Sequence, residues 1–316
     1  MKPIIFDTDP GIDDAIALLA AMAAPELDIL AITSVCGNVN IDLTTQNARN
    51  LVGFMHADIP VARGAEKPLL RPYEDASYAH GETGMGGYTF HNDPAPLSKK
   101  NALTIMKDVV EAAEEPVTLA CLGPLTNVAL FLHSYPNLKA KIKEVISMGG
   151  VYGALGNTHS LGEYNYFGDP HAVKMVFASG VPVTMIGLNV THTTKLLKDD
   201  LDELKEAGEV GQLVHGSLSH YTGGNLDQGY HMHDACVTLY ALKPELFTTE
   251  ALALDVVTDG VAQGAVVSDF LSEQEPNVNV AMAADVAAFR EELVKRLFQA
   301  EDWRKSQAKE ESVCGK

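Results

Sequence analysis

The chain has 316 residues, 46% of them hydrophobic, and a formal net charge of -19. This length and apolar content can bury a large core, whereas the acidic balance argues against a nucleic acid or an anionic membrane as partner, because both need a basic protein surface. The start, MKPIIFDTDP, reaches acidic residues after only three apolar ones, which is unlike a secretory or transit peptide.

Cysteine usage indicates a reducing compartment. Cys36, Cys121, Cys236 and Cys314 show no CxxC spacing, and the first three lie in apolar surroundings typical of reduced, buried thiols. The longest uncharged apolar run, residues 15–25, is too short to span a bilayer. We therefore expect a cytoplasmic protein without a membrane partner.

Stretches typical of strands alternate with stretches typical of helices along the first half of the chain. Strands are expected from Ile4 into Asp9 and at residues 27–35, 59–63, 117–121 and 144–148. Helices are expected at 13–22, at 42–55 with Asp42 as the cap, and at 102–113. A further helix is expected to begin at Pro124.

The second half continues this alternation. Helices are expected at 170–178, 199–207 and 210–221, and another begins at residues 231–234. A last helix should run from its cap Asp285 to about Trp303, with the last dozen residues frayed. Strands are expected at 183–188, 251–258, 264–268 and 278–282, and the stretches 72–96 and 151–169 are irregular. No linker or repeat interrupts the pattern. The sequence therefore predicts a single α/β domain over residues 1–316, with an open, mostly parallel (mixed) β-sheet flanked by helices.

Residues 4–15, IIFDTDPGIDDA, carry the first chemical signal. Asp7 and Asp9 follow a strand pattern, and Asp13 and Asp14 fall in the first turn of a helix, so four carboxylates converge at one strand end, where open α/β sheets bind ligands. Clustered carboxylates raise one another's pKa unless a cation lies among them, and all-oxygen ligands favour a hard ion such as Ca²⁺. Helix capping would explain only the second pair. The pattern favours a metal or catalytic cluster.

Six motifs in order resemble the inosine-uridine preferring nucleoside hydrolases. They are DTDPGIDD from residue 7, CGN at 36–38, HGETGMGG at 80–87, LGPLTN at 122–127, Asn157 with ExN at 163–165, and HMHDA at 231–235. The resemblance covers nearly the whole chain and implies the Rossmann-like nucleoside hydrolase fold. It also implies Ca²⁺-dependent hydrolysis of the N-glycosidic bond of ribonucleosides to ribose and free base. The segment GGNLDQGYHMHDA at 223–235 is more similar to the branch that acts on both purine and pyrimidine ribonucleosides.

The same resemblance implies the metal ligands. Asp9, Asp14 and Asp234 match the carboxylates that hold Ca²⁺ in the family, with Asp7 as a supporting group. Leu122 stands where the family offers a backbone carbonyl to the metal, and relatives often have Thr at this position. A change of side chain matters little for a carbonyl ligand.

Catalytic and substrate-binding roles follow in the same way. Asp9 matches the general base that activates a metal-bound water, and His233 matches the acid that protonates the leaving base. Inversion at the anomeric carbon is implied, without a covalent intermediate. The substrate-contacting positions are matched by Asp13, Asn38, His80, Asn157, Glu163 and Asn165.

Other polar residues receive weaker interpretations. Four of them lie in a segment that could close over the base, namely Tyr221, Asn225, Gln228 and Tyr230. The remaining histidines outside the motifs have no pairing that distinguishes them from solvated or structural residues; these include His56, His133, His159, His171, His192, His215 and His220.

Two alternatives stay open at the level of sequence. A phosphatase of the haloacid-dehalogenase type also opens with strand-DxD and would use Asp7 as nucleophile, but it needs a basic residue and a late Asp pair, whereas this chain offers His233 and Asp234. A non-catalytic nucleoside-binding protein would keep the metal site without turnover. The family resemblance further suggests a homodimer or homotetramer that serves nucleoside breakdown or salvage.

Overall fold

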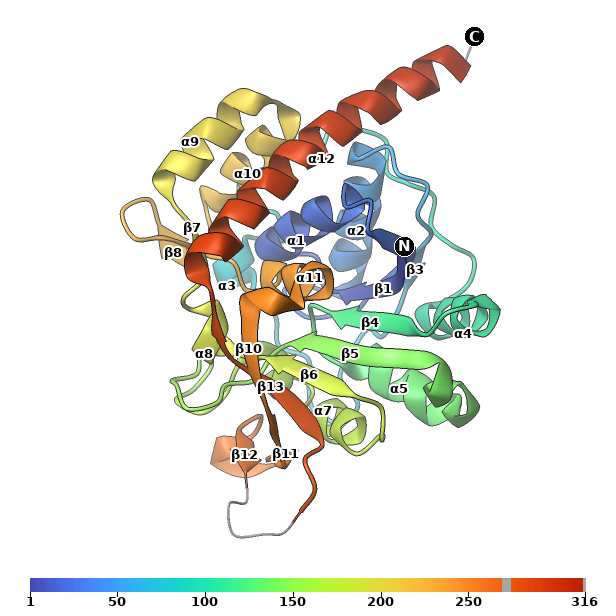
Figure 1. Cartoon of the computed structure of the whole chain (residues 1–316), viewed down its shortest axis with the longest axis vertical. Helices are drawn as coiled ribbons and strands as arrows, with labels where there is room; N and C mark the ends of the chain where they lie inside the picture. Colours follow the sequence, from blue (N-terminus) through green and yellow to red (C-terminus); the bar gives the residue numbers. More distant parts are fainter. Residues whose placement is uncertain (269–273, 315–316) are drawn as a thin grey trace.

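The computed structural model describes residues 1–268 and 274–314. Its centre is an eight-stranded sheet in the order β10-β13-β6-β5-β4-β1-β2-β3 (Figure 1). These strands are β1 (Lys2–Thr8), β2 (Leu27–Ser34), β3 (Val61–Arg63), β4 (Val117–Cys121), β5 (Ile142–Met148), β6 (Val183–Ile186), β10 (Phe247–Leu252) and β13 (Val278–Ala284). Every neighbouring pair is parallel except β10 and β13. The predicted mostly parallel, mixed α/β sheet is confirmed.

Helices cover both faces of this sheet. Ile4 and Phe6 of β1 belong to one apolar cluster and Ile5 to the other, as expected for side chains that alternate along a strand. The first cluster packs under α1 (Ile12–Met22), α2 (Ile41–Phe54), α10 (Glu209–Leu218), α11 (Ala235–Leu242) and α12 (Val286–Cys314). The second packs under α4 (Ala102–Ala112), α5 (Thr126–Ser134) and α7 (Pro170–Phe177).

Short elements complete the fold around the sheet. The helices are α3 (Ser77–His80), α6 (Tyr164–Gly168), α8 (Leu188–Thr191) and α9 (Lys198–Ala207), with 3₁₀ turns at Pro136–Lys141, Pro244–Leu246 and Gly260–Ala262. Two small sheets pair β7 (Lys195–Leu196) and β8 (Gly224–Asn225) with β9 (Gly229–His231), and β11 (Leu254–Val256) with β12 (Val266–Ser268). The stretch 72–96, which was predicted to be irregular, thus contains the short helix α3, and the irregular stretch 151–169 contains α6.

Several predicted boundaries are wrong. Asn40, and not Asp42, caps α2, because the Asn40 side chain accepts hydrogen bonds from the backbone N–H groups of Asp42 and Leu43. The helix predicted to open at Pro124 begins at Thr126. The last helix continues through Cys314 instead of ending near Trp303, and residues 315–316 lie outside the described part of the chain.

The strand predicted at residues 251–258 is divided between two sheets. β10 ends at Leu252, where its antiparallel pairing with β13 ends, and the chain then turns to pair β11 with β12. The side chain of Asn277 accepts the backbone N–H of Leu254 at 2.8 Å and stabilises this turn. The change of partner strand was not visible in the apolar pattern.

The parallel strands direct their carboxyl ends to one edge of the sheet. The loops after β1, β2, β4, β5 and β6 therefore meet at that edge, and these loops carry the polar motifs of the sequence.

Candidate functional site

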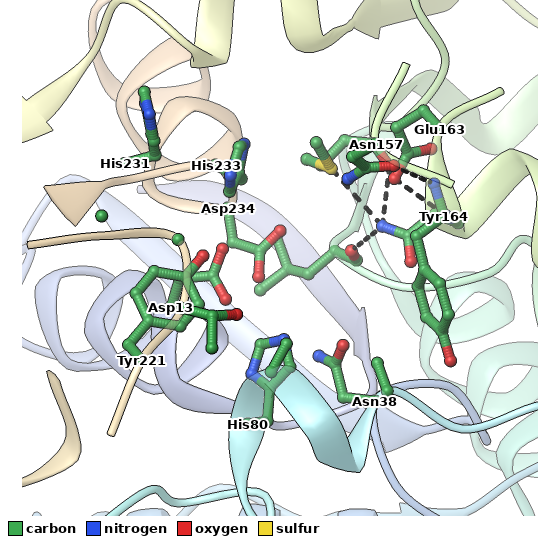
Figure 2. A pocket seen from close by; sticks show the side chains of 18 of the residues that line it. Asp13, Asn38, His80, Asn157, Glu163, Tyr164, Tyr221, His231, His233 and Asp234 are labelled. Carbon is green, nitrogen blue, oxygen red and sulfur yellow. Dashed lines mark hydrogen bonds between the residues drawn. The ribbon is translucent and has the colours of Figure 1, made fainter. Parts of the chain in front are cut away.

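A cavity of about 390 Å³ lies at this edge of the sheet. Figure 2 shows Asp13, His233 and Asp234 on one side of it and Asn157, Glu163 and Tyr164 on the other. The predicted site residues that line it are Asp13, Asn38, Leu122, His80, Asn157, Glu163, Asn165, His233 and Asp234. Asp9 and Asp14 do not line the cavity and are buried.

We call four interacting carboxylates the acidic floor: Asp13 and Asp234, which line the cavity, and the buried Asp9 and Asp14. One carboxylate oxygen each of Asp13, Asp14 and Asp234 lies within 4.8 Å of the others. Burial, and next the charge of a neighbouring aspartate, raises the pKa of Asp13 and of Asp234. The structure thus brings Asp13, a predicted substrate contact, into the group of carboxylates that could hold a metal ion.

Asp14 is held by three donors. The Thr8 hydroxyl donates to Oδ1 at 2.6 Å, while the backbone N–H of Gly11 and Nδ2 of Asn38 donate to Oδ2 at 2.9 and 3.0 Å. Asp14 therefore satisfies the start of α1 and also places a carboxylate at the strand end. Asp14 serves both as a capping residue of α1 and as a member of the carboxylate group.

Asp9 follows directly after β1 and is only 1% exposed. Its Oδ2 accepts the backbone N–H of Asn38 at 2.8 Å, while no group in residues 1–268 or 274–314 donates to its buried Oδ1. A Cβ atom on Gly37 would lie 1.9 Å from Oδ2, and one on Gly123 would lie 2.2 Å from Oδ1, so only glycine fits at either position. Burial, and next the charge of Asp14, raises the pKa of Asp9 well above its ordinary value.

These observations fit a hard cation. A buried carboxylate oxygen without a partner is unfavourable, and no Lys or Arg occurs among the residues that line the cavity in the described chain. Oxygen ligands from several carboxylates are the set that a divalent hard cation prefers. The acidic floor could therefore bind a metal ion.

Asp7 is directed away from the acidic floor. Its Oδ1 accepts hydrogen bonds from the Thr33 hydroxyl at 2.6 Å and from Nδ2 of Asn127 at 2.8 Å, and burial raises its pKa to about 7. Asp7 does not line the cavity. The side chain links β1 to β2 and α5 beneath the site.

Across the cavity, α6 presents Glu163 and Asn165. Glu163 caps this helix: its carboxylate accepts the backbone N–H groups of Asn165, Tyr166 and Gly150, and burial raises its pKa to about 7. Nδ2 of Asn165 donates to the carbonyl oxygen of Leu122 at 2.6 Å. This bond accounts for one lone pair of the Leu122 carbonyl and leaves the second available.

His80 joins the short helix α3 to the acidic floor. Its Nδ1 accepts the backbone N–H of Ile12 at 3.2 Å, and burial lowers its pKa, so the neutral ring carries its proton on Nε2. The ring centroid lies 5.6 Å from that of Tyr221, whose phenol forms a hydrogen bond with Asp13.

The histidine wall consists of His192, His231 and His233. Their ring centroids lie 5.2 to 5.7 Å apart, and Nδ1 of His233 is 2.7 Å from the Thr191 hydroxyl. Burial is the main cause that lowers the pKa of each of the three rings. The sequence did not distinguish His192 from a structural histidine, yet it lines the cavity. Its position just after a strand end, in LNVTHTT at 188–194, was the available signal.

Residues 4–291 match the family model described as inosine-uridine preferring nucleoside hydrolase. The chain belongs to this family of nucleoside hydrolases. It is 43% identical to the non-specific ribonucleoside hydrolase RihC of Salmonella newport over 291 residues, which cover 91% of this chain and 95% of that protein.

Solved structures agree with this assignment. A purine-preferring ribonucleoside hydrolase from Gardnerella vaginalis superposes with a TM-score of 0.89 at 27% identity and covers 95% of this chain and 99% of its own. A plant nucleoside hydrolase, PpNRh1, gives a TM-score of 0.88 at 29% identity and covers 94% of this chain and 99% of its own.

The predicted family, fold and enzyme class are confirmed: the chain is a nucleoside hydrolase that cleaves the N-glycosidic bond of ribonucleosides. The phosphatase and the non-catalytic binding protein are not supported, and the buried, hydrogen-bonded Asp7 is no exposed nucleophile. Within the described residues, no helix combines the length and apolar character required to cross a membrane.

Proposed function

We propose that this nucleoside hydrolase holds Ca²⁺ with the carboxylates of Asp9, Asp14 and Asp234 and the carbonyl oxygen of Leu122. The observation that carries the proposal is the buried Oδ1 of Asp9, which has no partner among the described residues, in a carboxylate that the charges of Asp14 and Asp13 oppose. Bound there, the ion would neutralise these carboxylates and act as a Lewis acid that makes water more acidic. Asp7 supports the site from beneath through its contacts with neighbouring elements.

Asp9 then acts as the general base. Its Oδ2 is oriented by the backbone N–H of Asn38. A carboxylate oxygen has two lone pairs, so Oδ1 can hold the ion with one and accept the proton of the attacking water with the other. The water attacks C1' of the ribose as this carbon develops oxocarbenium character, and the N-glycosidic bond breaks in the same step. One displacement gives inversion at the anomeric carbon.

Ribose binding requires donors and acceptors that stay paired when the sugar is buried. We assign this role to Asp13, Asn38, Asn157, Glu163 and Asn165, with His80 as a donor through Nε2. These side chains are already oriented by backbone hydrogen bonds, as the Glu163 carboxylate is by three N–H groups. Such preorganisation lowers the entropy cost of binding.

His233 protonates the leaving base. When the doubly protonated ring donates from Nδ1 to the Thr191 hydroxyl, its second proton lies on Nε2 and can pass to a ring nitrogen of the base as negative charge develops there, which leaves the ring neutral. The neighbouring rings of His192 and His231 border the same part of the cavity.

We infer that the substrates are purine and pyrimidine ribonucleosides such as inosine, uridine, cytidine and adenosine. The similarity to a protein named non-specific ribonucleoside hydrolase supports this range. Since no Lys or Arg lines the cavity in the described chain, a phosphorylated nucleoside would find no counterion there.

A reducing-sugar assay tests this function. Inosine, uridine, cytidine, adenosine, their 2'-deoxy forms and p-nitrophenyl phosphate are supplied with and without prior chelation, followed by return of Ca²⁺ or Mg²⁺. We expect ribose from purine and pyrimidine ribonucleosides, loss on chelation, recovery with Ca²⁺ and weak activity on deoxyribose. Release from only one base class would refute the broad range, and activity after chelation would refute the metal requirement.

We further infer a cytoplasmic homodimer or homotetramer. Cys36, Cys121 and Cys236 are buried free thiols, as expected in a reducing compartment; the side chain of Cys314 lies outside the described part. Light scattering coupled to size-exclusion chromatography tests the assembly, for which a monomeric mass would contradict the inference.

A further inference from the structure

Tyr164 lies in α6 between the two predicted ribose contacts Glu163 and Asn165, and its side chain lines the cavity (Figure 2). Its hydroxyl oxygen lies 2.8 Å from the carbonyl oxygen of Gly37 and 2.8 Å from that of Glu74. A phenol has one proton, so it can donate fully to only one of these two acceptors.

A second phenol also bonds to one of these two carbonyl groups. The hydroxyl of Tyr73 donates to the carbonyl oxygen of Gly37 at 3.1 Å. Because the carbonyl of Gly37 has this donor, it stays paired when Tyr164 gives its proton to the carbonyl of Glu74. Burial raises the pKa of both phenols, so both remain protonated donors at neutral pH.

The two carbonyl groups belong to segments that carry other parts of the site. Gly37 precedes Asn38, whose backbone and side chain bond to Asp9 and Asp14. Glu74 lies at the start of the rim segment, residues 73–80, which ends in His80 and carries three further cavity-lining residues. One hydroxyl therefore connects α6, the turn after β2 and the rim segment.

Other hydrogen bonds also hold the rim segment, among them that of the Tyr73 hydroxyl to Gly37 and that of the Gly86 N–H to the carbonyl of His80. The backbone N–H of Ala76 donates to the carbonyl of Asn38 at 2.9 Å, and Nδ1 of His80 accepts from Ile12. Both attach the rim segment to the acidic side of the cavity. On the opposite side, two contacts attach Glu74 to α6: the Tyr164 hydroxyl at the Glu74 carbonyl, and Arg71, which pairs with the Glu74 carboxylate and donates to the carbonyl oxygen of Phe167.

We propose that Tyr164 is a positioning residue whose hydroxyl sets substrate affinity by holding the rim segment closed against α6. The inference rests on the proposed function of this cavity. Without the hydroxyl, Glu74 keeps only its contact through Arg71 to α6, so the rim segment is held less firmly and part of its order must be gained when the substrate binds. This cost weakens binding. The chemical step, which depends on Asp9 and His233, does not use the hydroxyl.

The test is Tyr164→Phe in the full chain with Ca²⁺ present. We expect KM to rise roughly three- to tenfold, the range that follows from the net loss of one hydrogen bond, with kcat within about twofold. The rise should be equal for inosine and uridine, because Tyr164 adjoins the ribose contacts. Hydrogen exchange at the amides of Ala79, His80 and Gly81, which donate within α3, should become faster.

Tyr166→Phe is the matched control. Tyr166 lies in the same helix, is fully buried, and bonds through its hydroxyl to Ser147 at 3.2 Å instead of to the rim segment. We expect this variant to lower thermal stability while KM and the exchange of α3 stay at wild-type values. Tyr73→Phe should raise KM less than Tyr164→Phe, since the bond to Glu74 remains.

Unchanged KM and unchanged exchange in Tyr164→Phe would overturn the inference, and so would equal changes in Tyr166→Phe. Asp9→Asn separates this result from failure of the proposed function. If Asp9→Asn loses activity while Tyr164→Phe behaves as wild type, the active site stands and only the role of the hydroxyl is refuted.

Discussion

The acidic floor and the histidine wall border the same cavity, but burial acts on them in opposite ways. It raises the pKa of Asp9, Asp13 and Asp234 and lowers the pKa of His192, His231 and His233. In both regions burial favours the neutral form. The floor consists of carboxylates, whose charged form a bound cation stabilises. The wall consists of imidazole rings, whose charged form a cation would repel. Burial keeps the wall neutral, so His233 must take up a proton before it can protonate a leaving group.

The largest expected effect tests the floor. Asp9→Asn removes the proposed base but keeps an oxygen that can accept the N–H of Asn38, and we expect kcat on inosine to fall roughly a thousandfold. Steady-state kinetics with saturating Ca²⁺ measures this loss. Asp7→Asn is the control: the Asp7 carboxylate bonds to Thr33 and Asn127 and is assigned no step of the reaction, so its loss in kcat should be much smaller. Equal losses would show that Asp9 has no special role.

A smaller effect tests the wall. His233→Ala should lower kcat on inosine roughly a hundredfold, since the leaving purine needs a proton, and should spare p-nitrophenyl riboside, whose leaving group departs as a stable anion. The ratio of the two rates is the measurement. If both substrates lose rate equally, His233 has a structural role, for which its contact with Thr191 would be the reason.

The opposite pKa shifts predict opposite pH dependences of stability in the chelated protein. Asp13 has its pKa raised from 3.8 to about 7, so the folded state binds more protons in this window and wild type loses stability as pH rises through it. His231 has its pKa lowered from 6.5 to about 4, so wild type loses stability as pH falls through that window.

Two variants separate these contributions. Relative to wild type, the Tm of Asp13→Asn should increase as pH rises from about 4 to about 7, and the Tm of His231→Gln should increase as pH falls from 6.5 to about 4. Calorimetry at several pH values measures both. Added Ca²⁺ should make the Tm difference between Asp13→Asn and wild type depend less on pH, and should not change that dependence for His231→Gln. If the two Tm differences changed in the same direction with pH, the contrast between floor and wall would be refuted.

The smallest effect lies outside both regions. Asn40→Ala removes the cap of α2 and should lower the free energy of unfolding by about 1 kcal/mol, with unchanged kcat and KM. Chemical denaturation and an inosine assay measure these quantities. Asp42→Ala, at the position first predicted as the cap, should cost less.

Local patterns predicted much of the fold. The apolar run at 117–121 coincides with β4, and the helix expected at 102–113 is α4. Both elements depend on residues close together in the sequence: β4 is a run of buried side chains, and α4 begins after Asn101, whose side chain caps it. The predicted cap at Asp42 was wrong by two positions, since Asn40 and Asp42 are both plausible capping residues and only the backbone conformation distinguishes them. The partner strand of residues 251–256 depends on contacts that no local pattern contains.

The sequence alone determined the family, the alternation of strands and helices, and the polar motifs that line the cavity, because polar motifs after parallel strands must meet at one sheet edge. Tertiary structure alone decided that His192 joins the wall and that the hydroxyl of Tyr164 reaches Gly37, 127 residues away. These contacts depend on how separate loops pack against each other. The spacing of residues along the chain does not carry that information.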